Sequence, residues 1–125
     1  MKELNLLYNI ISNINVLGKV KFEKLEILNL NINKIKSIDI LDKVDFKELK
    51  ELYLSWNEIS DIDILERLKF DKLEKLDLRW NKIENISILA KISLKELKEL
   101  NLSNNSISDI RILEKLKFEK LKIAI

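Results

Sequence analysis

Apolar side chains recur along this chain in two patterns that follow one another within every 24 residues. In the segment 52–54, leucines at alternate positions predict a short β-strand with one buried face. From 59 to 68, isoleucine or leucine returns at every third residue, which is typical of a helical turn with one apolar side. The pattern predicts a unit that contains a strand, a turn, a short helix and a return to the next strand.

This unit repeats along the whole chain. The residue that follows each strand and its turn is always asparagine: Asn9, Asn33, Asn57, Asn81 and Asn105. A fixed period of this length indicates that no unit can bury its apolar face alone, so stacked units create the core. We expect a single domain, 1–125, with five 24-residue repeats that start at residues 1, 25, 49, 73 and 97, followed by a terminal strand at 121–125.

Stacking should place successive strands side by side in parallel, with right-handed connections between them. The expected fold class is α/β: a right-handed solenoid with a parallel β-sheet on the concave face and short helices on the convex face. Each asparagine amide should bond backbone groups of its own turn and of the neighbouring turn. Ser60 and Asp61 precede the expected helix of the third unit as candidate N-caps. A phenylalanine column should lie in the core: Phe22, Phe46, Phe70 and Phe118.

The residues of the third unit carry a family resemblance. The motif LxxLxLxxNxIxxI, with its fixed positions at Leu49, Leu52, Leu54, Asn57, Ile59 and Ile62, resembles the leucine-rich repeat. The run 57–62 is similar to the bacterial internalin-like subclass in particular. The unit here is longer than is usual in that subclass, and we expect the extra residues to give a fuller helix. Members of the family mostly bind other proteins on the concave sheet, so the resemblance implies a protein-binding function.

Charged residues near the start of each strand alternate in sign from one unit to the next. Three columns show the pattern: Lys24, Glu48, Lys72, Glu96 and Lys120; Glu23, Lys47, Asp71, Lys95 and Glu119; Lys2, Glu26, Lys50, Glu74 and Lys98. Stacking should turn these columns into rows of ion pairs that favour the correct register. By the same spacing, Lys122 would follow Lys98 and break the alternation.

Composition argues against catalysis and against several ligand classes. The chain has no histidine, no cysteine and one glycine, so it has no catalytic triad, zinc site or phosphate-binding loop, and we expect no enzyme activity, no metal and no cofactor. Asp61 and Asp63 are better explained as helix caps than as metal ligands. The net charge of +2 and the lack of a long apolar run favour a soluble cytoplasmic protein that binds neither nucleic acid nor membrane.

The candidate binding residues are those that point away from the core. One column contains Tyr8, Ile32, Trp56, Trp80 and Asn104, so both tryptophans lie in adjacent units, about 5 Å apart. Exposed aromatic rows are typical of interfaces. We expect a protein partner to contact Tyr8, Ile32, Tyr53, Trp56, Asp77, Arg79 and Trp80. Two other interpretations stay open: the rings only cover the edge of the sheet, or single-stranded nucleic acid stacks on them.

The last segment is apolar and suggests an alternative function. An unprotected strand edge is a template for another chain. Copies could therefore stack end to end into a structural assembly through Leu121, Ile123 and Ile125. The same exposed ends would also arise if the chain were a fragment or if a partner covered them. Lys122 opposite Lys2 would oppose stacking in perfect register.

Overall fold

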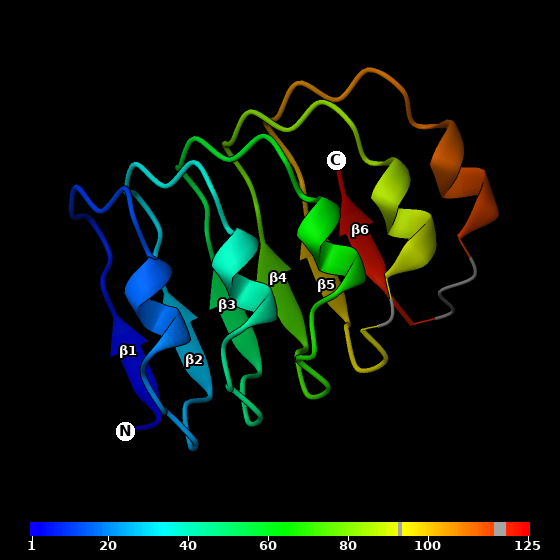
Figure 1. Ribbon diagram of the computed structural model, residues 1–125. Coiled ribbons are helices and arrows are strands. Elements are labelled where there is room, and N and C mark those ends of the chain that lie inside the picture. Colours follow the sequence, from blue (N-terminus) through cyan, green and yellow to red (C-terminus); the bar gives the residue numbers. More distant parts are fainter. Residues whose placement is uncertain (93, 117–119) are drawn as a thin grey trace.

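The computed structural model describes residues 1–92, 94–116 and 120–125. Six parallel strands form one open sheet in chain order: β1 (Glu3–Asn5), β2 (Ile27–Asn29), β3 (Glu51–Tyr53), β4 (Lys75–Asp77), β5 (Glu99–Asn101) and β6 (Lys122–Ala124). Figure 1 shows the sheet as one layer, with the helical segments as a second layer and the chain termini at opposite ends. The solenoid predicted from the period is confirmed.

The outer layer consists of short 3₁₀ helices. They are η1 (Asn15–Gly18), η2 (Asp39–Asp42), η3 (Asp63–Glu66), η4 (Ser87–Lys91) and η5 (Arg111–Lys115). The expectation of a fuller helix was therefore wrong. Apolar residues at every third position match the three residues per turn of a 3₁₀ helix better than the 3.6 of an α-helix. The spacing of the apolar residues in the sequence thus already favoured a 3₁₀ helix over an α-helix.

The start of each helix is held by a short polar side chain, and of the two residues expected to cap η3, Asp61 takes this role and Ser60 does not. The N-cap of η3 is Ile62, which has no capping side chain. Instead, the Asp61 carboxylate accepts a hydrogen bond from the N–H of Asp63 at 2.9 Å. Ser60 takes no part in this contact. Equivalent bonds to the residue two positions on are made by Asn13, Ser37, Asn85 and Asp109.

The core is continuous across the units. Leu28, Leu52, Leu76 and Leu100 stand in register on neighbouring strands and are buried, as are Leu54 and Leu78. At the opposite end of the units, the Phe46 ring stacks on Phe22 and Phe70 with centroid distances of 6.1 and 6.5 Å. Phe118 lies outside the described residues. Truncation of one such buried ring to alanine typically costs about 3–5 kcal/mol.

The conserved spacing of the asparagines produces a ladder of hydrogen bonds. The Asn57 side-chain N–H group donates to the carbonyls of Leu54 and Ser55 in its own turn and of Leu30 in the preceding unit. Its carbonyl oxygen accepts the N–H of Ile35 at 3.0 Å. Asn33 and Asn81 repeat this pattern and, like Asn57, are buried. The structural role expected for these residues is confirmed.

Two of the three alternating charge columns form ion pairs. Lys72 contacts Glu48 at 2.8 Å and lowers the pKa of that carboxyl group. Lys50–Glu26 and Lys98–Glu74 are longer pairs, at 3.8 and 3.7 Å. These groups are partly or fully exposed to solvent, so each pair contributes little to stability. The column that begins with Glu23 forms no ion pair among the described residues, because its described members lie too far apart.

The final strand departs from the period. From β1 to β5, residues 24 positions apart are paired, whereas Glu99 pairs with Lys122 and Leu100 pairs with Ile123, which is a step of 23. A step of 24 would have put Ala124 beside Leu100, so the shorter step gives the inward position to the larger side chain. Lys122 is therefore the strand partner of the acidic Glu99 instead of following Lys98, and Leu121 takes the next position of that charge column.

Candidate functional site

The candidate site is a row of side chains at the end of the strands. We call Tyr8, Ile32, Trp56, Trp80 and Asn104 the exposed row; each immediately precedes the repeated asparagine of its unit. Tyr8 is 77% exposed, Trp56 52%, Trp80 44% and Ile32 38%. The structure thus places the four large side chains on the surface, as expected from the alternation.

The two tryptophans stack directly on each other. Their ring centroids are 4.4 Å apart and the ring planes differ by 12°. This distance is close to the value expected from the spacing of adjacent strands. Stacking covers one face of each ring and leaves the edges exposed. Within the described part of the chain, neither indole N–H has a hydrogen-bond acceptor.

The backbone of the exposed row is left-handed in every unit, which sequence reasoning missed. The φ angles are 59° at Tyr8, 54° at Ile32, 57° at Trp56, 54° at Trp80 and 58° at Asn104. This conformation costs most residues about 1–2 kcal/mol, and only glycine, asparagine and aspartate adopt it readily. Asn104 was the one signal in the sequence that could have revealed the conformation.

The neighbouring asparagine column explains why the turn persists with unsuitable side chains. The Asn57 amide ties the two carbonyls before Trp56 together, and the Trp56 carbonyl accepts the N–H of Asn33 from the preceding unit. The Trp56 N–H donates to the Arg79 carbonyl in the following unit. Ile32 is held in the same way, by the N–H of Asn9 and the carbonyl of Ser55, so both residues are fixed from two sides whatever their own preference. Tyr8 and Trp80 donate their N–H to the following unit.

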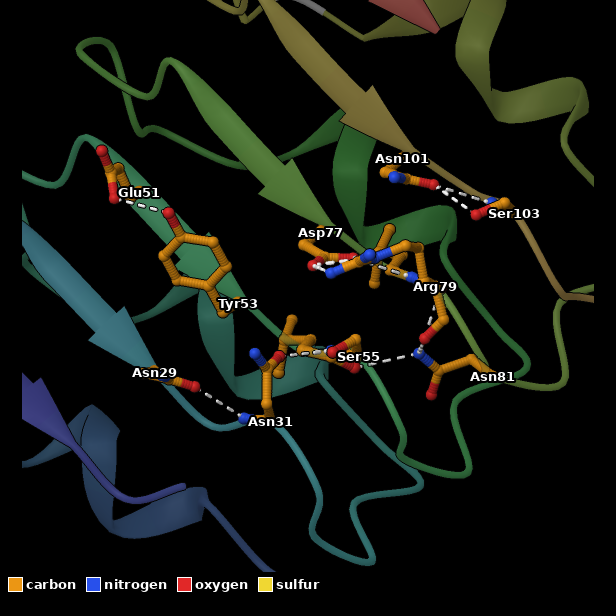
Figure 2. Close-up of polar contacts among 12 residues, drawn as sticks. Asn29, Asn31, Glu51, Tyr53, Ser55, Asp77, Arg79, Asn81, Asn101 and Ser103 are labelled. Carbon is orange, nitrogen blue, oxygen red and sulfur yellow. Dashed lines mark hydrogen bonds and ion pairs between the residues drawn. The ribbon is translucent and has the colours of Figure 1, made fainter. Parts of the chain in front are cut away.

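Beside the row, the charged groups of the sheet bind one another. Figure 2 shows the Arg79 guanidinium against the Asp77 carboxylate, with an Nη2–Oδ2 distance of 2.7 Å and Nε contacts of 3.0 and 3.1 Å. This pairing raises the pKa of Arg79. Asp77 is buried, whereas Arg79 remains partly exposed next to Trp80. The pair gives the surface one fixed polar feature.

Tyr53 is the other aromatic residue of the sheet surface. Its hydroxyl donates to the Glu51 carboxylate at 2.6 Å, also shown in Figure 2. Burial, followed by the bond to Glu51, raises the pKa of Tyr53 to about 12. Tyr53, Asp77 and Arg79 thus come from adjacent strands, whereas Trp56 and Trp80 follow those strands in the turns.

Tyr53 occupies a position that is otherwise reserved for asparagine or aspartate. In the other units, the side-chain oxygen at this position accepts the N–H two residues on: the acceptors are Asn5, Asn29, Asp77 and Asn101. Tyr53 has no such oxygen in reach of Ser55. Asn31 from the preceding unit supplies it instead and accepts the Ser55 N–H at 2.7 Å, as drawn in Figure 2. The structure thereby tolerates a tyrosine on the sheet surface.

Two hollows accompany these features. One, of about 480 Å³, lies at the row itself, and its lining residues are Tyr8, Asn9, Ile10, Ile32, Asn33 and Lys34. A larger hollow, of about 770 Å³, lies away from the row between η4 and η5. Arg111 in its wall is bound to Asp109 at 2.6 Å, and this bond lowers the pKa of Asp109 to about 2. Five of the nine residues that line the larger hollow are charged, whereas Lys34 is the one charged residue among the six that line the hollow at the row, so the latter is better suited to an apolar side chain.

The residues expected at the end of the solenoid lie on or beside β6. Leu121 and Ile123 are partly buried, and Ile125 is 46% exposed. Among the residues that the structure describes, no helix is long and apolar enough to span a membrane. The same part of the chain contains no cluster of three or more acidic side chains that could hold a metal ion. Asp61 and Asp63 instead meet through the Asp63 backbone.

Comparisons with known proteins agree with this architecture. The family model described as Leucine Rich repeats (2 copies) matches residues 47–91, and the one described as Leucine Rich Repeat matches residues 96–116. Together the matches span more than half of the chain. No curated protein matches the sequence.

Solved structures give the same result. Internalin C2 from Listeria monocytogenes is 32% identical, with a TM-score of 0.74 over 94% of this chain and 48% of that chain. A leucine-rich repeat protein of Leptospira interrogans is 27% identical, with a TM-score of 0.66 over 98% and 36% of the two chains. The ectodomain of the receptor kinase SOBIR1 from Arabidopsis thaliana is 25% identical, with a TM-score of 0.64 over 97% and 66%.

The chain therefore spans about half the length of internalin C2 and about a third of the Leptospira protein. The internalin-like likeness noted in the asparagine turns extends through the arrangement of the whole sheet. The period, the ladder of asparagines and the family matches all lead to one assignment. The chain belongs to the leucine-rich repeat family, close to its internalin-like members.

Proposed function

We propose that this chain is a noncatalytic protein-binding module whose partner docks on the concave sheet along the exposed row. The partner would contact Tyr53 and the Asp77–Arg79 pair at the same time, because they come from the strands that lead to Trp56 and Trp80. Solenoids of this kind commonly use an extended concave surface to bind proteins. The proposal for this chain rests on its own residues as well as on that general behaviour.

The observation that carries the proposal is the presence of large apolar side chains at left-handed backbone positions. Four of the five units have tyrosine, isoleucine or tryptophan there. Isoleucine is especially unfavourable because its branched Cβ crowds the backbone in this conformation. Asparagine, as at Asn104, would satisfy the same turn with less strain. These side chains are unfavourable in the left-handed conformation and, being apolar, are also unfavourable in contact with water. A partner that covers them best explains their presence, since strained positions concentrate at functional sites.

Coverage of the sheet edge explains these residues less well. Stacking of Trp56 on Trp80 contributes about 0.5–1.5 kcal/mol beyond buried area, which is no more than the strain of the two positions. Tyr8 has no aromatic neighbour within the described residues and remains 77% exposed, so it gains little from packing. Nucleic acid is also disfavoured, because the Arg79 guanidinium beside the rings is already bound to Asp77.

The two tryptophans allow a direct test. The chain has only two, so an ¹⁵N-labelled sample gives two indole N–H signals, both from the site. Binders selected from a displayed library of short random peptides should shift both signals. The double variant Trp56→Ser/Trp80→Ser should bind these peptides at least about 30-fold more weakly, as expected for loss of a hot spot. Its melting temperature should stay within a few degrees of the wild type, because the rings lie outside the core.

A matched control uses exposed apolar residues away from the row. Val16 and Ile110, which are 63% and 53% exposed, can be changed together to serine. This variant should bind as tightly as the wild type. Equal loss of binding in both variants, unshifted indole signals, or unfolding of the tryptophan variant would each contradict the proposal. A single-stranded oligonucleotide that shifts the indole signals would favour nucleic acid instead.

A second candidate function is end-to-end assembly. β6 pairs on one side with β5, and three apolar residues in or next to it, Leu121, Ile123 and Ile125, are all partly exposed. Another copy could add its first strand there. Light scattering over a concentration series tests this idea, because an assembly would grow with concentration and a mass that does not change would contradict it. Ile125→Lys should prevent the growth.

A further inference from the structure

The hollow beside Tyr8 is distinct in character from the rest of the exposed row. Trp56 and Trp80 close the space between their units by stacking, whereas Tyr8 and Ile32 leave a hollow of about 480 Å³. This volume is within the range of small-ligand pockets, and it is ample for one large side chain. Ile32 lines the hollow and also neighbours Trp56 in the row, so a segment that follows the row reaches the hollow directly.

The lining of the hollow suits an apolar anchor. Tyr8, Ile10 and Ile32 supply its apolar walls. The Asn33 amide, at the base, is fully used by the carbonyls of Leu6, Leu30 and Asn31 and by the N–H of Ile11. The Lys34 N–H is likewise bound to the Ile11 carbonyl. The exposed Asn9 amide N–H group donates to the carbonyls of Leu6 and Leu7, so the polar groups left for a ligand are the Asn9 side-chain oxygen, the Tyr8 hydroxyl and the Lys34 ammonium group.

The rim of the hollow is basic. Lys34 lies in its wall and Lys36 follows two residues later, and both are exposed. Neither forms an ion pair within the described residues. The segments 4–22 and 27–38, which build the hollow and its surroundings, contain no aspartate or glutamate. The corresponding segment of the next unit is acidic: Glu58 is the equivalent of Lys34, and Asp61 lies three residues later.

We propose that this hollow receives a leucine, isoleucine or phenylalanine side chain from an extended acidic segment of the protein partner. Carboxylates on either side of the anchor residue pair with Lys34 and Lys36. The inference rests on the proposed function and specifies the partner's chemistry at one end of the row. Apolar contact supplies most of the affinity, and the lysines supply selection between acidic and basic segments.

The test uses peptides selected on the wild-type chain from a displayed random library. Sequences that bind should be enriched in an apolar residue with neighbouring aspartate or glutamate. Two synthetic peptides are then compared by fluorescence anisotropy: the strongest binder, and the same peptide with its acids changed to lysine. The acidic peptide should bind about tenfold more tightly, and the difference should shrink at high salt. Its addition should shift the amide signals of Tyr8, Ile10 and Ile32.

Charge reversal on the protein supplies the matched comparison. Lys34→Glu/Lys36→Glu should bind the acidic peptide about tenfold more weakly and the lysine peptide more tightly. Lys43→Glu/Lys47→Glu makes the same change in net charge away from the hollow, and should leave both dissociation constants unchanged. Tyr8→Ser should weaken binding of either peptide, since it removes a wall of the hollow.

Several results would overturn the inference. They are a selection that yields no enriched sequence, enriched peptides without acids, equal weakening by the two charge-reversed variants, and shifts that avoid Tyr8 and Ile32. Peptides that lose affinity for Trp56→Ser/Trp80→Ser but are indifferent to Lys34→Glu/Lys36→Glu would remove this inference and leave the proposed function intact. Peptides that bind the tryptophan variant and the lysine variant as tightly as the wild type would contradict this inference and the proposed function together.

Discussion

The asparagine column and the exposed row lie side by side in every unit, and their side chains relate to the backbone in opposite ways. Asn33, Asn57 and Asn81 are buried and satisfy carbonyls in two units. One residue earlier, Tyr8, Ile32, Trp56 and Trp80 make no side-chain hydrogen bond within the described residues, and they disfavour the left-handed backbone that they occupy. The first column is uniform in sequence, and the second varies.

The asparagines hold the turn, so the preceding residue does not have to favour its own conformation. Under the proposed function, the first column supplies stability and the second column is free to vary with the partner. Substitutions in one column at a time test this contrast. The free energy of unfolding should fall when an asparagine is removed and should change little or rise when a residue of the exposed row is replaced.

Removal of an asparagine from the centre of the ladder should have the largest effect. Asn57→Ala leaves the Ile35 N–H and several carbonyls without partners in a buried turn, so it should lower the free energy of unfolding by at least about 3 kcal/mol. Asn9→Ala is the control, because Asn9 is exposed and bonds only Leu6 and Leu7. Urea denaturation measures both values, and equal losses would contradict the ladder.

Loss of the Asn31 side chain should come next. Asn31→Ala leaves the N–H of the buried Ser55 unpaired and should cost about 1–3 kcal/mol. The Tyr53→Asn background restores the local acceptor found in the other units, so the same change there should cost less than about 1 kcal/mol. A double-mutant cycle by urea denaturation gives both values. If the cost is the same in both backgrounds, Asn31 has no compensating role.

A change in the exposed row should act in the opposite direction. Tyr8→Asn replaces a mostly exposed ring by a residue that adopts the left-handed conformation readily, so it should raise the free energy of unfolding by about 1 kcal/mol. Trp80→Asn should be closer to neutral, because it also removes the stack on Trp56. Thermal unfolding distinguishes the two. Destabilisation by Tyr8→Asn would show that the row supports the fold.

The smallest effect concerns pH. Because the folded-state pKa of Tyr53 is raised from 10.0 to about 12, the favourable contribution of the neutral phenol is complete below pH 10. That contribution is lost as the pH rises from about 10 to about 12. In the variant Tyr8→Phe, whose one tyrosine is Tyr53, ultraviolet absorbance should show an ionisation near pH 12. An ionisation near pH 10 in that folded variant would contradict the burial of Tyr53 and its bond to Glu51.

The sequence predicted the features that depend on side-chain spacing. Alternating leucines identified the sheet, and the period identified its register from β1 to β5. The partners of Asn57 and the pairing of Lys72 with Glu48 followed from the same spacing. The closeness of Trp56 and Trp80 did so as well. Each of these features repeats from unit to unit. Comparison of equivalent residues in several units therefore identifies contacts that the sequence of one unit alone would not.

Other features depended on competition between backbone conformations. Four of the five residues of the exposed row disfavour a left-handed turn, so propensity alone could not reveal it. The shortened step before β6 arose because Ile123 fills the inward position better than Ala124. Asn31 compensates for Tyr53 across two units, which no column displays. The binding role predicted for Tyr8, Ile32, Trp56 and Trp80 stays a prediction, which the peptide experiments address.

The left-handed turn also bears on how such a surface can change over time. Tyrosine, isoleucine, tryptophan and asparagine all adopt nearly the same φ in this column, from 54° to 59°. A single substitution can therefore alter the side chain that the surface presents without reshaping the chain around it. Under the proposed function, specificity would evolve one unit at a time, on a scaffold that tolerates the exchange.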